Sequence, residues 1–289
     1  MPSLREGNGF SPERYKFHSS GEIQMSWHVA AYTASLGSVT DTDTPAVTDD
    51  VLTILNGHFV LRKEMSLVGA YAGGGTTSRV RFDSPTLRYY GNPLIRPFDN
   101  VAVPANNYNF DYSFDNPFVL PPGEEIAVQW STTGVGPTRV FAFIFITDGI
   151  QRVGGGNIYP VRATSSTAAV ANAWTTIGNP ITLQQALPTG AFEMVYSEVQ
   201  STTGIAHRWI FDEQLNRPGF VSVAVLGNRT PYYQQTFPWG TMGRFINTAL
   251  PRLQVWCTAA DASFEIVLYV RPLGRNISGI VPSGQPYLA

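Results

Sequence analysis

Histidines and carboxylates are the first residues to consider for chemistry in this chain, and their spacing does not form a site. The four histidines, His18, His28, His58 and His207, are isolated, and none has a glutamate at ligand spacing. A metal site on a β-sandwich needs such ligands gathered together. The pattern therefore predicts strand or turn histidines and no resident metal.

Motifs for nucleophilic attack or phosphate binding are also absent. The chain has no Gly-x-Ser-x-Gly elbow, which hydrolases of that type require. Gly73–Ser78 has the glycines of a phosphate loop but lacks its lysine. Cys257 is the only cysteine, and it lies in an apolar segment, where a buried small side chain is the usual role. We predict no catalytic residues and no cofactor, so the protein is not expected to be an enzyme.

One acidic loop offers a candidate cation site. Asp41, Asp43, Asp49 and Asp50 lie close together in a threonine-rich segment, and clustered carboxylates are the ligands that Ca²⁺ prefers. The glycine and final glutamate of an EF-hand are missing, and the second half of the chain has no equivalent acids. A solvated connecting loop is the favoured interpretation, with calcium as the alternative.

Aromatic residues provide the candidate interaction surface. Tyr89 and Tyr90 follow one Phe-Asp segment, while Tyr232, Tyr233 and Trp239 follow another, next to turn-forming residues. Exposed rings of this kind stack on sugars, and they also dominate protein–protein contacts. We favour assembly contacts over carbohydrate binding.

The elements that must position these residues are predicted to be strands. The chain contains 27 Gly and 21 Pro among 289 residues, so few windows are long enough for a helix. Short β-branched and aromatic runs recur between turn residues, which is typical of sandwiches and barrels. The expected strands are 23–33, 59–71, 79–82, 108–114, 126–130, 140–147, 158–163, 192–199, 207–211, 220–226, 253–257 and 264–270.

The two halves of the chain resemble each other in order. Gly57, Asp83, Val128 and Ile146 match Gly190, Asp212, Val255 and Val270, at separations of 133, 129, 127 and 124 residues. Ordered matches with slowly shrinking separations indicate one strand sequence repeated with shorter loops. We predict an all-β fold of two tandem eight-stranded jelly-roll sandwiches related by internal duplication.

Domain limits follow from composition. The Gly154–Gly156 run suggests a hinge, giving a first jelly roll at 22–150 and a second at 157–273. Residues 1–21 are expected to form an N-terminal arm and 274–289 a C-terminal tail. The net charge of −2 predicts no specific nucleic-acid binding. The N-terminal residues have no apolar core of a signal peptide, which suggests synthesis in a cytoplasm.

The duplicated unit, its size and the lack of a catalytic site resemble the double jelly-roll major capsid proteins of tailless icosahedral viruses, especially phages with an internal membrane. The resemblance covers about Ile23 to Pro272 and rests on architecture rather than on a motif. It implies a virion protein that forms homotrimers, each a pseudo-hexagonal block contacting neighbouring trimers and other capsid or vertex proteins. The N-terminal arm would then reach toward an inner membrane.

Three alternatives remain open at this stage. A tandem carbohydrate-binding, lectin-like protein would expose the tyrosines named above. An enzyme acting on polysaccharides or peptide amides would need a cleft with convergent acids or histidines between the sandwiches. A single jelly roll with an unrelated second domain would show a different strand order in its second half.

Overall fold

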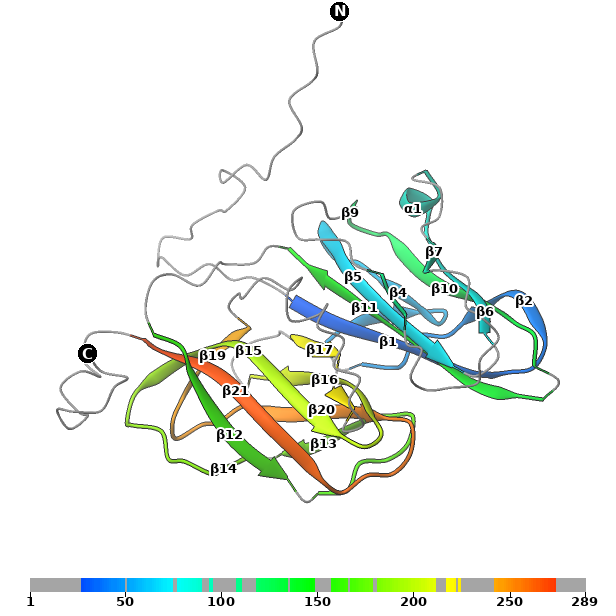
Figure 1. Ribbon diagram of the computed structural model, residues 1–289. Coiled ribbons are helices and arrows are strands. Elements are labelled where there is room, and N and C mark those ends of the chain that lie inside the picture. Colours follow the sequence, from blue (N-terminus) through cyan, green and yellow to red (C-terminus); the bar gives the residue numbers. More distant parts are fainter. Residues whose placement is uncertain are drawn as a thin grey trace, which may run out of the picture.

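The computed structural model describes residues 27–49, 51–74, 77–89, 94–95, 108–110, 118–134, 136–148, 157–165, 167–178, 181–211, 217–221, 223–224 and 242–273. In these residues the chain is built almost wholly of strands (Figure 1). The predicted all-β class is therefore confirmed. None of their helices has the length and apolar character needed to cross a bilayer.

The first half of the chain forms two sheets that face each other, here called the first sandwich. One sheet has the order β1 (Trp27–Leu36), β11 (Thr138–Thr147), β5 (Met65–Gly74), β8 (Tyr108–Phe110), with β9 (Phe118–Leu120) also paired to β5. The other has the order β3 (Thr53–Leu55), β4 (His58–Val60), β10 (Glu125–Thr132), β6 (Thr77–Asp83), β7 (Leu94–Ile95), with β2 (Val39–Thr44) also paired to β10.

The second half forms a second sandwich. Its first sheet has the order β14 (Thr182–Leu183), β12 (Tyr159–Ser165), β21 (Phe264–Leu273), β15 (Ala191–Ser201), β18 (Val223–Ala224), with β19 (Gly243–Ile246) also paired to β15. Its second sheet has the order β13 (Trp174–Gly178), β20 (Arg252–Cys257), β16 (Gly204–Ile210), β17 (Gly219–Val221).

The two sandwiches share one strand order. In each, the first strand of the half pairs with the last, and the last pairs with a long central strand: β1–β11–β5 in one and β12–β21–β15 in the other. In each, the facing sheet runs through β2–β10–β6–β7 or β13–β20–β16–β17. The second half of the chain therefore repeats the strand order of the first.

The correspondence extends to single residues. Val68 of β5 bulges opposite Phe145 and Ile146 of β11. Val195 of β15 bulges in the same way opposite Tyr269 and Val270 of β21. A bulge is a specific local feature that related structures retain.

A polar pair is repeated as well. The Arg81 Nε donates to Gln129 Oε1 at 2.6 Å across β6 and β10. The Arg208 Nε donates to Gln254 Oε1 at 2.7 Å across the corresponding strands β16 and β20. The bulges and the Arg–Gln pairs together show which residue of the second half corresponds to each residue of the first. The separation is 127 residues for β5 and β6, 125 for β10 and 124 for β11.

These registers correct part of the sequence alignment. The match of Ile146 with Val270 agrees with the shared bulge. The matches of Asp83 with Asp212 and of Val128 with Val255 are two residues out of register, because Arg81 corresponds to Arg208 and Gln129 to Gln254. The match of Gly57 with Gly190 is wrong: Gly57 turns the β3–β4 hairpin, whereas Gly190 leads into β15.

Several elements differ from the expected ones. The strand expected at 220–226 contains parts of β17 and β18, which belong to different sheets. The strand expected at 59–71 is two strands, β4 and β5, which belong to different sheets. A short helix, α1 (Pro85–Tyr89), follows β6 and was not expected. The Ser84 hydroxyl accepts a hydrogen bond from the Leu87 backbone N–H at 3.1 Å, and proline occupies the first helical position. This is a normal helix start.

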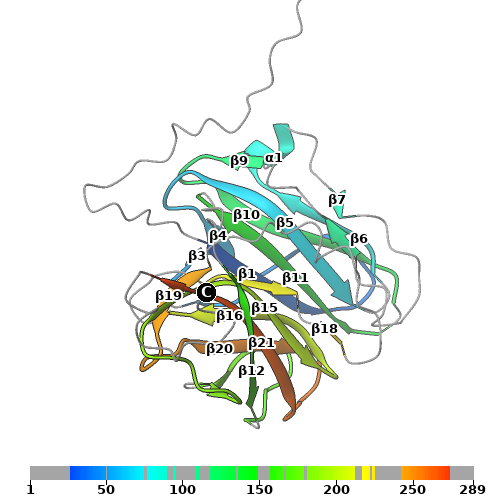
Figure 2. The same cartoon turned by 60° about the vertical axis from the view of Figure 1, so that its left-hand side comes forward.

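The apolar run of β11 explains how the sandwiches are joined. Val140, Ala142, Ile144 and Ile146 point into the core of the first sandwich. Phe141, Phe143 and Phe145 point the other way and belong to the core cluster of the second sandwich. A strand that is apolar on both faces is buried on both faces. In Figures 1 and 2, β1 and β11 accordingly lie at the boundary between the two sandwiches.

Candidate functional site

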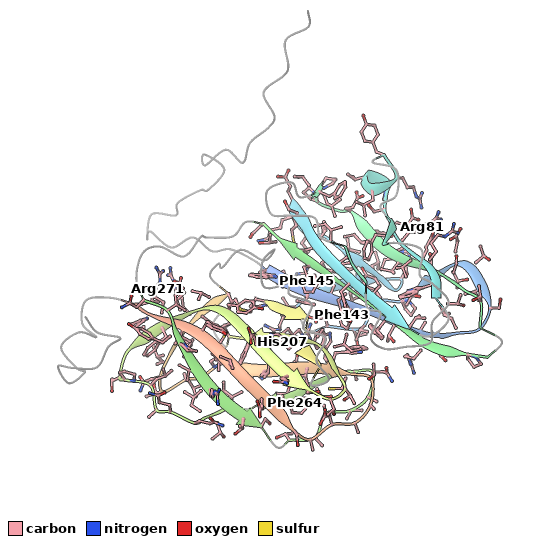
Figure 3. The ribbon with its side chains drawn as sticks, viewed as in Figure 1. Arg81, Phe143, Phe145, His207, Phe264 and Arg271 are labelled. Atoms are coloured by element: carbon pink, nitrogen blue, oxygen red, sulfur yellow. The ribbon has the colours of Figure 1, made fainter. Side chains whose placement is uncertain are left out.

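The buried contact between the sandwiches is the most distinctive arrangement of side chains in the described residues. Phe143 meets Trp174 and Trp256 edge to face, with ring centroids 5.8 and 5.6 Å apart. The rings come from β11, β13 and β20, so strands from both halves meet here (Figure 3). Edge-to-face rings add to the free energy gained by burying their area. The contact therefore has the character of a protein core.

An ion pair is enclosed in the same contact. Arg208 of β16 pairs with Asp49, which lies between β2 and β3, and their side chains are 4% and 2% exposed. The guanidinium lies 4.5 Å from the centroid of the Trp174 ring. The second carboxylate oxygen of Asp49 accepts the backbone N–H groups of Val51 and Leu52. Each charge is thus compensated, as burial requires.

Backbone hydrogen bonds close one end of the contact. The Val29 N–H donates to the Arg217 carbonyl at 3.0 Å, and the Arg217 N–H donates to the Trp27 carbonyl at 2.9 Å. His28, between these residues, is 7% exposed. Burial lowers the pKa of His28 from 6.5 to about 4, helped by nearby Lys63, so the imidazole is neutral at physiological pH.

The acidic-loop residues do not gather into a cation site in the described residues. Asp41 pairs with Arg79, and Asp49 pairs with Arg208. Asp43 lies 3.9 Å from His58. No group of three or more His, Cys, Asp or Glu side chains that could hold a metal ion occurs in the described part of the chain. Asp50 lies outside it.

Of the aromatic candidates, only Tyr89 lies in the described residues. It ends α1 with 87% of its surface exposed, while Leu87 of the same helix is fully buried. Leu87 anchors the helix, and Tyr89 is held out from it. Tyr90, Tyr232, Tyr233 and Trp239 lie outside the described residues, so their role as interface residues stays a prediction.

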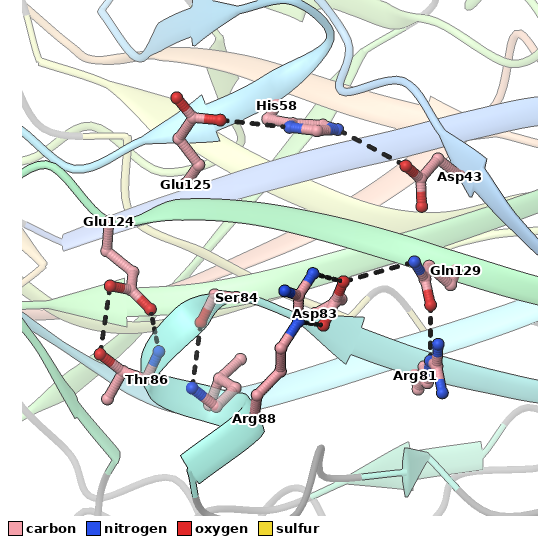
Figure 4. Close-up of polar contacts among 11 residues, drawn as sticks. Asp43, His58, Arg81, Asp83, Ser84, Thr86, Arg88, Glu124, Glu125 and Gln129 are labelled. Atoms are coloured by element: carbon pink, nitrogen blue, oxygen red, sulfur yellow. Dashed lines mark hydrogen bonds and ion pairs between the residues drawn. The ribbon is translucent and has the colours of Figure 1, made fainter.

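A polar network surrounds α1 on the outer face of β6 and β10 (Figure 4). Arg88 donates two hydrogen bonds of 2.6 Å to the Asp83 carboxylate, and Gln129 donates a third at 3.3 Å. The Arg88 guanidinium holds the pKa of the Asp83 carboxyl below its usual range. Glu124 accepts the Thr86 N–H at 2.6 Å. These hydrogen bonds from Thr86 and Arg88 hold α1 against β6 and β10.

His58 lies between two carboxylates on the same surface. Its Nδ1 is 3.5 Å from Glu125 and its Nε2 is 3.9 Å from Asp43 (Figure 4). All three side chains are partly exposed. A histidine between two carboxylates suits proton transfer only beside a nucleophile or a bound substrate.

A serine–histidine pair that the sequence analysis missed lies inside the second sandwich. Ser197 Oγ is 2.9 Å from His207 Nε2, and the Trp209 Nε1 donates to Ser197 Oγ at 2.7 Å. Both Ser197 and His207 are buried. Burial lowers the pKa of His207 from 6.5 to about 3, which makes it a poor base at neutral pH. The pair therefore satisfies buried polar atoms instead of forming a nucleophile.

The remaining predicted residues fit structural roles. Cys257 is fully buried, as expected from its apolar segment, and burial raises the pKa of its thiol. Gly73 lies in β5 and pairs with Phe141 of β11, and β5 and β6 belong to different sheets, so this glycine is a strand residue instead of part of a flexible hairpin loop. His18 lies outside the described residues.

No family model and no curated protein matches this chain. Among solved structures, it is similar to the major capsid protein P2 of bacteriophage PM2, at 10% identity over 86% of this chain and 99% of that one, with a TM-score of 0.24. It is also similar to a chain of Sulfolobus Turreted Icosahedral Virus, at 11% identity over 89% and 94% of the two chains, with a TM-score of 0.23.

A third similar structure comes from an archaeal virus described by its triple jelly-roll fold and turret assembly. The identity is 12% over 86% of this chain and 79% of that one, with a TM-score of 0.20. The similar structures include a viral major capsid protein, the kind of protein that the sequence resembles. The structural overlap with each is slight.

Proposed function

We propose that this chain is a structural virion protein, the major capsid protein of an icosahedral virus, and that it has no catalytic role. The repetition of one sandwich within the chain is the observation that carries the proposal. The shared strand order, the shared bulge and the two Arg–Gln pairs support internal duplication into two jelly rolls, at 22–150 and 157–273.

The physical reason for such a repeat lies in closed assembly. A head-to-tail contact forms a ring when its rotation closes, and similar faces must then alternate around the ring. Three chains with two like sandwiches each supply six similar blocks, which form a pseudo-hexagonal trimer. Such trimers tile a shell through contacts with each other and with other capsid or vertex proteins.

Composition supports an assembling surface. Charged residues make up 14% of the chain, against about 25% in typical soluble domains, and interface cores are poor in charge. The arm at 1–21 and the tail at 274–289 are proposed to link trimers, with the arm also reaching toward an inner membrane. The protein would be made in the host cytoplasm and reside in the virion.

The test is the mass of the purified protein in solution, measured by light scattering after size exclusion. A stable trimer of about 95 kDa, three times the 31.6 kDa chain, is expected at micromolar concentration. A protein that stays a monomer at all accessible concentrations contradicts the proposal.

A second candidate, a carbohydrate-binding protein, is favoured by one observation. Tyr89 presents 87% of its surface on a helix that is anchored by Leu87, and rigid exposed rings stack on sugars. A glycan array distinguishes the candidates: a monomer whose sugar binding is lost in Tyr89→Ala supports carbohydrate binding and overturns the capsid proposal.

A further inference from the structure

The contact between the sandwiches joins two unlike sheet faces. The β11 face, defined by Phe141, Phe143 and Phe145, belongs to the first sandwich. The β20 face, defined by Arg208, Gln254 and Trp256, belongs to the second sandwich. Phe143 meets Trp256 at 5.6 Å between ring centroids. One face of each kind is therefore used within the chain.

The repeat means that each sandwich also carries the other kind of face. By the bulge register, Phe141, Phe143 and Phe145 correspond to Glu265, Val267 and Tyr269 of β21, here called the β21 face. By the Arg–Gln register, Arg208, Gln254 and Trp256 correspond to Arg81, Gln129 and Ser131, here called the β10 face.

These two faces remain partly open to solvent in a single chain. Phe143, Phe145 and Trp256 are fully buried in the contact between the two sandwiches. At the corresponding positions Glu265 is exposed, and Val267, Tyr269 and Gln129 are only partly buried. One chain therefore buries its β11 face and its β20 face against each other. The corresponding faces, the β21 face and the β10 face, are left for contact with another molecule.

We propose that the β21 face of one copy docks on the β10 face of a second copy, repeating the packing of the β11 face on the β20 face. The inference rests on the proposed function and specifies which surfaces join the copies. The partner is a second copy of this chain because the within-chain contact already shows that faces of these two kinds fit together.

The chemistry of the open faces suits association between folded chains. Glutamate, valine and tyrosine replace the three phenylalanines of the β11 face, so the β21 face can remain in water before assembly. Tyr196 packs beside Tyr269 with ring centroids 5.5 Å apart, and Tyr and Arg are enriched where interfaces gain most of their affinity. Fully buried apolar contacts are typical of permanent interfaces, and mixed ones of separable interfaces.

Charge also matches across the two faces. Strand β6 carries Arg79 and Arg81 beside Gln129 and Ser131 of the β10 face. Asp41 pairs with Arg79 and Asp83 pairs with Arg88 on the same surface, so three arginines stand against two aspartates there. The β21 face carries Glu265 and, on the adjacent strand β15, Glu198. Within the chain, Arg208 of the β20 face is compensated by Asp49. In the docked pair, the glutamates of the β21 face are expected to compensate Arg81.

The first test uses single substitutions on each face. Val267→Glu and Arg81→Glu are expected to weaken trimer formation on the order of 30-fold or more, as central interface residues do. Val170→Glu is the matched control, because Val170 is 61% exposed and lies on neither face. Unchanged thermal unfolding of each variant as a monomer shows that the chain remains folded.

The second test joins the faces covalently. Cys257 is buried, so cysteines introduced as Gln129→Cys and Val267→Cys are the reactive ones. When the two separately purified variants are mixed with a short bis-maleimide, a linked dimer is expected. Mixing Gln129→Cys with Val170→Cys should give only the background yield.

The outcomes separate this inference from the proposed function. A protein that remains a monomer contradicts both. A trimer that is unaffected by Val267→Glu and Arg81→Glu and gives no Gln129–Val267 cross-link leaves the capsid proposal standing and overturns the inference about the faces.

Discussion

Replacing Asp49 by asparagine is expected to destabilise the protein far more than any surface ion pair could explain. Asparagine keeps the shape of Asp49, and it keeps an oxygen for the backbone N–H groups of Val51 and Leu52. It removes the negative charge beside Arg208, whose side chain is only 4% exposed. The variant therefore isolates the effect of leaving a buried guanidinium uncompensated.

The expected loss follows from burial. Removing one partner of a buried ion pair costs about 3–5 kcal/mol, because the remaining charge is kept from water. The cation–π contact of Arg208 with Trp174 keeps part of the compensation, so we expect the lower end, about 3 kcal/mol. Removing the guanidinium as well, as in Asp49→Asn with Arg208→Met, keeps the acceptor for the Val51 and Leu52 N–H groups and should recover most of this loss.

The chain supplies a matched control. Asp41 pairs with Arg79 in the same way, but these side chains are 32% and 37% exposed. Asp41→Asn is therefore expected to cost much less free energy of unfolding than Asp49→Asn, because solvent screens an exposed pair. Urea unfolding followed by tryptophan fluorescence measures both free energies of unfolding. Equal losses for Asp49→Asn and Asp41→Asn would refute the reasoning that the sandwich contact encloses a buried charge pair.

Three further predictions concern the cores. Phe143→Ala should cost about 3–5 kcal/mol by leaving a cavity between the sandwiches, whereas Tyr89→Ala should change the unfolding midpoint little; equal effects of the two contradict the packing. Ser197→Ala should cost about 1–3 kcal/mol by removing the partner of Trp209, and a variant as stable as the parent argues against the buried pair. His28 and His207 have pKa values lowered by burial to about 4 and about 3. As pH falls below about 6.5, these histidines bind protons in the unfolded chain but not yet in the folded one. The free energy of unfolding therefore decreases as the pH falls from about 6.5 toward 4. The loss is about 2 kcal/mol per histidine at pH 5, measured by urea unfolding at each pH. His207→Asn should show about half of it, and a flat profile between pH 7 and 5 contradicts the burial of both imidazoles.

The sequence was informative where a pattern has one structural solution. The run Val140–Ile146 is apolar at every position, and it forms a strand buried on both faces. Its match with the last strand of the second half agrees with the shared bulge. The register of the Phe-Asp segments was missed by two residues because side chains alternate with period two in strands. An alignment that is shifted by two residues still matches buried positions with buried ones and exposed positions with exposed ones. The hydrophobic pattern therefore does not reveal such a shift.

Contacts between distant residues were harder to predict. Ser197 and His207 meet because β15 and β16, which are consecutive in the chain, lie in the two facing sheets of the second sandwich. A sequence pattern of strands does not show which sheet each strand joins, so the pair was missed. The pairing of Asp49 with Arg208 spans 159 residues and depends on how the two sandwiches pack. No local pattern in the sequence encodes that packing, so Asp49 was interpreted as part of a solvated loop, with calcium binding as the alternative. The solvated-loop interpretation is wrong for Asp49, whose side chain is 2% exposed.

The central claim is that two like sandwiches in each chain build a closed trimer, and electron microscopy of the purified protein tests it most directly. Averaged particle images viewed along the symmetry axis are expected to show a ring of six similar lobes with three-fold symmetry. Single two-lobed particles at all concentrations, or closed assemblies with another symmetry, would contradict the account.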